Sequence, residues 1–201
     1  MISTTPLLAG LATALLCIAL ATMLLPLNRL PVAARLLVIV IITLLAMLPL
    51  ADNPGWYYVR GVFGDSSITG LLFYIALVMQ QNFSWQLYRE NELVLLRRLV
   101  LAAAILLYPF ALGLTRFDSY SQGYANPWLL AFLFIIALFF WLKKYYFLAL
   151  SITAAVFACT LQLLESLNLW DYLLDPLFVV LVMLTWLRPP LSSGHTLKPD
   201  M

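Results

Sequence analysis

Residues 127–142 read PWLLAFLFIIALFFWL, sixteen residues without a single charged side chain. Asn126 followed by Pro127 is a typical helix start, because Asn caps the free N–H groups and Pro suits the first helical position. Six more apolar stretches lie before and after this one. The seven stretches cover about residues 6–25, 32–50, 67–86, 93–114, 127–142, 145–164 and 169–187. A helix needs about 20 residues to cross a ~30 Å hydrocarbon core. The pattern therefore predicts an all-α, polytopic bundle of about seven transmembrane helices.

The composition of the chain points the same way. Of its 201 residues, 64% are hydrophobic and 10% are charged, and the mean hydropathy is +0.99. Soluble domains are about half apolar and a quarter charged, so we expect the lipid bilayer to be the solvent of this chain. Residues 1–187 are predicted to form one transmembrane domain. The segment 188–201, rich in Pro, Ser and Gly, is predicted to be a disordered cytoplasmic tail.

The basic residues predict an orientation. Nine of the eleven Lys and Arg residues fall on one side of the predicted spans: Arg29, Arg35, Arg89, Arg97, Arg98, Lys143, Lys144, Arg188 and Lys198. The other side has only Arg60 and Arg116. Because basic loops stay in the cytoplasm, the N-terminus is expected outside and the C-terminus inside. The short loops favour a multi-pass protein of the bacterial inner membrane.

Several classes of function are disfavoured. The net charge of +2 and the lack of a basic patch argue against nucleic acid as a partner. Cys17 and Cys159 fall inside apolar stretches, and the only histidine, His195, is in the tail. We therefore expect neither a metal site nor a cofactor. Catalytic sequence motifs such as a nucleophile elbow, a P-loop or a zinc-protease helix are absent from the sequence, and no catalytic residue is predicted.

Polar and aromatic side chains gather in three segments predicted to face outward, at about residues 51–67, 115–128 and 165–176. Arg60 and Arg116 stand on the side that is otherwise poor in positive charge, so each needs a carboxylate or an anionic ligand. We predict an outward cup that binds a polar headgroup. Its candidate ligand-binding residues are Trp56, Tyr58, Arg60, Asp65, Arg116, Glu165, Trp170, Asp171 and Asp175. The alternative is that these residues anchor the chain at the membrane interface and cap helices.

Asp175 is the most informative single residue. If the last helix begins at Leu169, Asp175 lies about two turns inside it, where an ionisable group is costly unless it is paired. Asp171 lies one turn earlier, so the two carboxylates could share a proton or a cation, or bind one arginine. Alternatively, both only stabilise the positive N-terminal end of the helix. Alternatively, Asp175 and Pro176 are the cap and the first residue of a shorter helix, about 12 residues long. We favour the continuous helix, because the shorter one spans only about 18 Å.

Two main classes of function fit these expectations. The first is a protein that binds, or helps to move, an amphiphilic or lipid-linked headgroup, acting as an accessory subunit of an envelope-assembly complex. Its partners would be membrane lipids and other envelope membrane proteins. The second is a membrane-embedded enzyme that modifies lipid headgroups at the outer leaflet, which the lack of a membrane-facing His disfavours. A purely structural membrane subunit is the third possibility.

Overall fold

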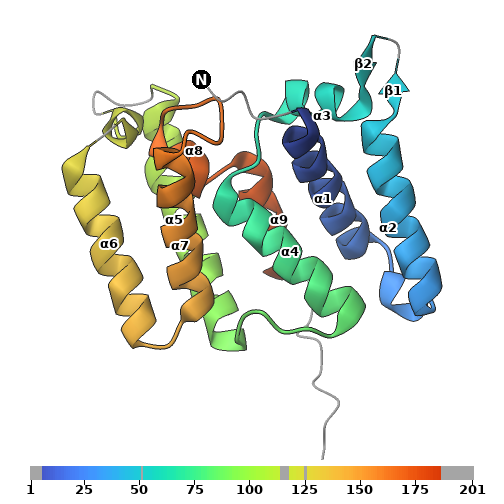
Figure 1. Cartoon of the computed structure of the whole chain (residues 1–201). Helices are drawn as coiled ribbons and strands as arrows, with labels where there is room; N and C mark the ends of the chain where they lie inside the picture. Colours follow the sequence, from blue (N-terminus) through green and yellow to red (C-terminus); the bar gives the residue numbers. More distant parts are fainter. Residues whose placement is uncertain (1–5, 51, 114–117, 125, 187–201) are drawn as a thin grey trace, which may run out of the picture.

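A computed structural model describes residues 6–50, 52–113, 118–124 and 126–186 of the chain. The predicted tail at 188–201, together with Arg116, Arg188 and Lys198, lies outside the described residues. Almost all of the described chain is helical, which confirms the all-α prediction (Figure 1). The main helices are α1 (Pro6–Leu24), α2 (Val32–Met47), α4 (Ile68–Phe83), α5 (Glu90–Ala111), α6 (Pro127–Leu142), α7 (Tyr146–Thr160) and α9 (Pro176–Trp186). Each comes from one of the seven apolar stretches.

Shorter elements join these helices. They are η1 (Leu27–Arg29), β1 (Pro49–Leu50), β2 (Asn53–Pro54), α3 (Gly55–Phe63), η2 (Tyr120–Gly123) and α8 (Leu169–Leu173). The two strands pair antiparallel as a tight hairpin before α3. The segment 51–67, treated as a loop in the sequence, therefore contains a nine-residue helix.

Three parts of the chain are long and apolar enough to cross a membrane: Leu7–Leu24, Glu90–Ala111 and Leu169–Trp186. The other apolar helices, α2, α4, α6 and α7, are 15 or 16 residues long. By length and composition, then, the structure has three candidate spanning helices among its described residues, which is fewer than the seven predicted.

Successive main helices run in opposite directions, so their connections gather at two ends of the molecule (Figure 1). One end, which we call the cavity end, carries the hairpin, α3, η2 and α8. The opposite end, which we call the basic end, carries η1 and the connections at 84–89 and 143–145. Among the described residues, every Lys and Arg except Arg60 belongs to the basic end or to the helix turns beside it.

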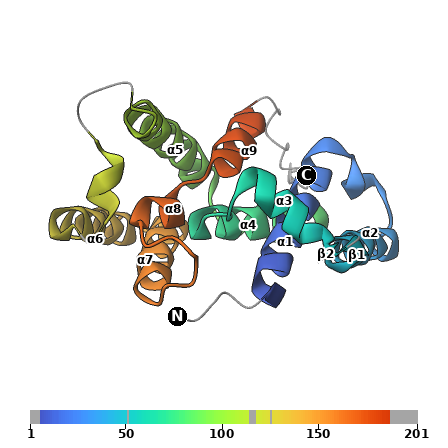
Figure 2. The ribbon, with the colours of Figure 1, turned by 90° about the horizontal axis from the view of Figure 1, so that it is seen from above.

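Helix α4 occupies the middle of the bundle, with α2 and α6 at its two edges (Figure 2). Phe73 and Tyr74 of α4 are completely buried, and they pack against Phe178 of α9. In contrast, no residue of α2 is buried. The core is therefore built around α4, and the edge helices turn long apolar faces outward.

The last apolar stretch is broken into α8 and α9, so the prediction of one continuous helix from Leu169 is wrong. Leu174 is extended, with φ −147° and ψ 130°. Two causes act together. Proline disfavours the helical conformation in the residue before it, and the Asp175 side chain accepts the backbone N–H of Phe178 at 2.8 Å, as a capping residue does. The alternative, in which Asp175 and Pro176 open a short helix, is the correct one.

Close packing fastens η2 to α8 at the cavity end. A Cβ added to Gly123 would lie 1.7 Å from Oδ1 of Asn168. Asn168 cannot move aside easily, because it is fully buried and its side chain binds the N–H of Trp170 and the carbonyl of Tyr120, both at 2.9 Å.

We predict that Gly123→Ala lowers the free energy of unfolding by about 1–3 kcal/mol, the usual cost of overpacking. Thermal unfolding in detergent measures this. The matched control is Gly61→Ala in α3, where an added Cβ has no neighbour within 4 Å; it should leave stability unchanged or raise it by up to about 1 kcal/mol. Equal melting of the two variants would show that η2 and α8 are not packed as described.

Candidate functional site

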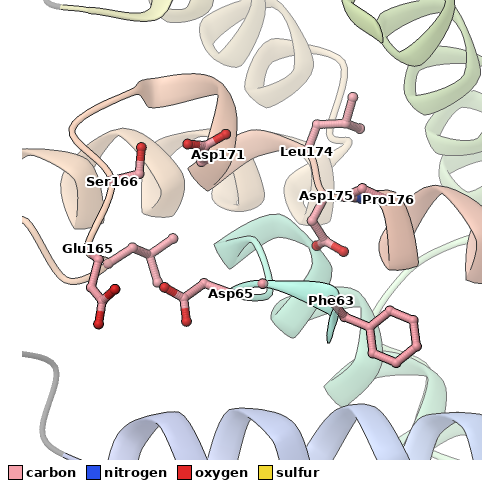
Figure 3. A pocket seen from close by; sticks show the side chains of 10 residues that line it. Phe63, Asp65, Glu165, Ser166, Asp171, Leu174, Asp175 and Pro176 are labelled. Carbon is pink, nitrogen blue, oxygen red and sulfur yellow. The ribbon is translucent and has the colours of Figure 1, made fainter. Parts of the chain in front are cut away.

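A cavity of about 330 Å³ opens at the cavity end, and four acidic residues are among those that line it (Figure 3). It is lined by Phe63, Gly64, Asp65, Leu164, Glu165, Ser166, Asp171, Leu174, Asp175 and Pro176. These residues come from the end of α3, the segment before α8, α8 itself and the start of α9. The lining combines carboxylates with apolar side chains, and its size is at the lower end of the range for small-molecule sites.

Arg60 neutralises two of the four carboxylates. Its Nε lies 2.5 Å from Oδ1 of Asp65 and its Nη2 lies 2.7 Å from Oε1 of Glu165. A second nitrogen bond to Asp65, at 2.9 Å, makes that pair bidentate. The hydrogen bond from Arg60 to the Asp65 carboxylate raises the pKa of the guanidinium further. Arg60 therefore has a protein carboxylate as its partner, which is one of the two possibilities that the sequence predicted.

Asp175 lies deeper, at the floor of the cavity, and is only 5% exposed. Its Oδ2 accepts the N–H and the hydroxyl of Ser67 at 2.8 and 2.6 Å, and its Oδ1 accepts the N–H of Phe178. Among the described residues, the hydrogen-bond partners of Asp175 are uncharged donors from the starts of α4 and α9 and not an arginine. Asp175 therefore joins the N-termini of two helices.

Gly70 leaves room for this arrangement. A Cβ at that position would lie 2.8 Å from Oδ2 of Asp175 and 3.1 Å from Cβ of Phe178. Ser67 also caps α4 itself, since its hydroxyl accepts the N–H of Gly70 at 3.0 Å. Its second role, as a partner of Asp175, joins two residues that are 108 positions apart in the sequence.

Asp171, on α8, binds a residue of η2. Its Oδ2 accepts the Tyr120 hydroxyl at 2.8 Å. Burial, and then this bond to Asp171, raise the pKa of the Tyr120 phenol above its ordinary value. The neighbouring Trp170 donates its ring N–H to the carbonyl of Ser119 at 3.1 Å. Tyr120, from the second predicted outer segment but not among the candidate ligand-binding residues, thus links η2 to the acidic lining.

The three aromatic residues predicted to bind the ligand, Trp56, Tyr58 and Trp170, are not part of the cavity lining. Trp56 is buried and lies beside Gly10 of α1. Tyr58 is exposed and donates its hydroxyl to the carbonyl of Leu50. Trp170 contacts η2 as described above. Arg116 lies outside the described residues. The structure therefore brings together Arg60, Asp65, Glu165, Asp171 and Asp175, but places Trp56, Tyr58 and Trp170 elsewhere.

Within the described part of the chain, no group of three or more His, Cys, Asp or Glu side chains is arranged to hold a metal ion. No family model, curated protein or solved structure matches this chain. Any conclusion about function therefore rests on the physical character of the fold and of this cavity.

We predict that Asp175→Asn lowers the free energy of unfolding by about 1.5–3 kcal/mol, the range for hydrogen bonds to a charged group. The amide keeps one acceptor oxygen but turns an NH₂ group toward N–H or O–H donors. At about 2–4 °C per kcal/mol for a chain of this size, the melting temperature in detergent should fall by about 3–12 °C.

Glu165→Gln is the matched control for the Asp175 variant. The Glu165 side chain is 73% exposed, and exposed ion pairs contribute only about 0–1 kcal/mol. Melting of Asp175→Asn that is indistinguishable from wild type would mean that Asp175 does not join α4 and α9.

Proposed function

We propose that this chain is a seven-span protein of the bacterial inner membrane that binds the polar headgroup of an amphiphile in the cavity described above. The observation that carries the proposal is the position of an acceptor-rich cavity at one end of an apolar bundle. A headgroup would sit among the carboxylates while its tail follows the apolar surface beside them. Phe63, Leu164, Leu174 and Pro176 supply that apolar part of the lining.

The edge helices support a lipid environment. Exposed large apolar side chains follow the whole length of α2 and α6. They include Leu36, Leu37, Val40, Ile41, Leu44 and Leu45 on α2 and Phe132, Phe134, Ile135, Leu138 and Phe139 on α6. Soluble monomers rarely expose continuous apolar patches of more than a few hundred Å². Lipid tails are the surroundings in which such faces cost no free energy.

Exposed aromatic side chains mark both ends of the bundle. Tyr57, Tyr58, Tyr124 and Trp128 belong to the cavity end, and Trp85, Trp141, Tyr146 and Trp186 belong to the basic end. Trp and Tyr prefer the two membrane–water interfaces. Helices of 15 or 16 residues are about 22–24 Å long, so α2, α4, α6 and α7 would cross with their ends in the headgroup regions, where a short helix is accommodated by local thinning of the bilayer.

The orientation proposed from the basic residues places the cavity end outside and the basic end in the cytoplasm. In a background without Cys17 and Cys159, a cysteine at Ser121 should react with a membrane-impermeant thiol reagent added to intact cells. A cysteine at Ser84, which is exposed at the basic end, should react only after the cells are opened. The reverse labelling pattern, or reaction of both in intact cells, would contradict the topology.

The charge of the cavity narrows the ligand class. Four carboxylates line it, and Arg60, which among the described residues is the one guanidinium at the cavity end, already binds two of them. A phosphate or carboxylate ligand would meet excess negative charge. Of the two partners that the sequence left open for Arg60, a protein carboxylate or an anionic ligand, the protein carboxylates of Asp65 and Glu165 are present. Hydroxyl or ammonium groups, which donate hydrogen bonds, are complementary to this lining. We therefore propose a sugar or amine headgroup, as in a lipid-linked substrate that this chain holds as an accessory subunit.

Three probes with the same twelve-carbon tail test this ligand class: dodecyl maltoside, dodecylamine and dodecyl phosphate. Each is added below its micelle-forming concentration to protein in nanodiscs. A ligand at about 100 times its Kd stabilises by about 2.7 kcal/mol. We expect the maltoside or the amine to raise the melting temperature more than the phosphate does.

Asp65→Asn combined with Glu165→Gln should reduce that rise, whereas Lys143→Gln at the basic end should leave it unchanged. A larger rise with the phosphate would contradict the proposed ligand class. If no probe has an effect that depends on the cavity residues, the purely structural role would be favoured instead.

A further inference from the structure

The cavity is polar toward one edge and apolar toward the other. Figure 3 shows the two groups on opposite sides: Glu165, Ser166 and Asp171 on the polar side, and Phe63, Leu174 and Pro176 on the apolar side. Asp175 lies near the apolar side, but donors of Ser67 and Phe178 already bind both of its oxygens. A hydrocarbon tail attached to a headgroup in the cavity therefore has its apolar way out past Phe63 and Pro176.

This apolar edge lies at the surface of the molecule and not in its core. Phe63 lines the cavity and is nevertheless 51% exposed. Its neighbour Val62 is more exposed still, and Pro176 on the facing element is exposed as well. The cavity thus has an apolar rim that is open to the surroundings of the bundle between the end of α3 and the start of α9.

Helix α9 continues the apolar rim. Of the main helices, α9 alone contributes a residue to the described lining, which is Pro176. Val180 and Met183 follow it at spacings of four and three residues, so the three side chains share one face of the helix. Both are about half exposed, while most of the residues between them are buried. An exposed apolar stripe therefore begins at the cavity and runs about 10 Å along α9 toward the basic end.

We propose that Pro176, Val180 and Met183 form a tail path: the alkyl tail of the bound amphiphile lies along this stripe while its headgroup occupies the cavity. The ligand is then a lipid that enters sideways from the outer leaflet, past Phe63, and not a solute that enters from water. This inference rests on the proposed function, to which it adds the source and the route of the ligand.

The tail path sets the direction of the ligand more than its affinity. Lipid tails are as apolar as the side chains of a spanning helix, so a tail gains little free energy by exchanging lipid for α9. The polar contacts of the headgroup supply the affinity instead. The exposed faces of α2 and α6 are equally apolar, but no described residue of either helix lines the cavity. A tail anchored in the cavity therefore lies beside α9 and not beside those helices.

Fluorescence quenching in nanodiscs tests the tail path. In a background without Cys17 and Cys159, Val180→Cys is labelled with a small fluorophore. Leu44→Cys on α2 and Leu130→Cys on α6 are the controls, since all three positions are exposed and lie three or four residues from the cavity end of their helices. The probes are dodecyl maltoside and dodecylamine with bromine along the chain, because bromine quenches only on close approach.

At probe concentrations that raise the melting temperature, the label at Val180 should be quenched about twofold or more above both controls, because the bound headgroup keeps the tail beside it. Asp65→Asn combined with Glu165→Gln should lower this quenching to the level of the controls, whereas Lys143→Gln should not. If Val180→Cys does not fold, Met183→Cys on the same stripe takes its place and should give the same result.

Equal quenching at all three positions would overturn the tail path, because ordinary bilayer lipid would then cover α9 as it covers α2 and α6. Weaker quenching at Val180 than at both controls would also overturn it, since protein, such as a second copy of the chain, would then cover this face. Either result, together with a rise in melting temperature that depends on the cavity residues, would leave the proposed function standing. No such rise with either probe would overturn both.

Discussion

The structure depends on two buried carboxylates, each of which ties together the N-termini of two helices. At the cavity end, Asp175 accepts N–H groups from the starts of α4 and α9. At the basic end, Glu92 is 3% exposed and accepts the N–H of Arg89, which opens α5, and the N–H of Phe147, in the first turn of α7, both at 3.0 Å. Helix N-termini carry unpaired N–H groups and partial positive charge. In an apolar bundle, a carboxylate shared by two helices accepts hydrogen bonds from these N–H groups and offsets their positive charge. It also fixes how the two helix N-termini are aligned.

This constraint also produces the cavity. The last apolar stretch breaks at Leu174, where Pro176 and the capping side chain of Asp175 open α9, and the short α8 covers the end of the bundle. The short α8 then carries Asp171 to the rim, where the Tyr120 hydroxyl holds it, while Arg60 gathers Asp65 and Glu165 on the facing side. The acidic lining is therefore a consequence of the helix break and not of a single local motif.

The two ends of the molecule differ in what their polar groups do. At the basic end, arginines bind backbone carbonyls: Arg97 donates to the carbonyl of Thr185 near the end of α9, and Arg35 donates to the carbonyl of Asn82 near the end of α4. Cations at helix C-termini offset the negative end of the helix dipole. At the cavity end, Asp175 binds helix N-termini and Arg60 binds the carboxylates of Asp65 and Glu165.

By itself, the sequence determined where the main helices lie and that most of the basic residues fall on one side of them. These features follow from local composition and from caps such as Asn126, whose side chain accepts the N–H of Trp128 as predicted. It also marked Arg60, Asp65, Glu165, Asp171 and Asp175 as residues of one polar region. Only the tertiary structure decided their partners. Asp175 binds Ser67 and not an arginine, and Asp171 binds Tyr120. Trp56 packs against α1 instead of lining the cavity. The role of Glu92 at the basic end was not predicted either. The physical reason is that a charge in an apolar bundle is satisfied by whichever donor the packing of distant helices brings within about 3 Å, and that distance is a property of the assembled bundle, not of any one segment.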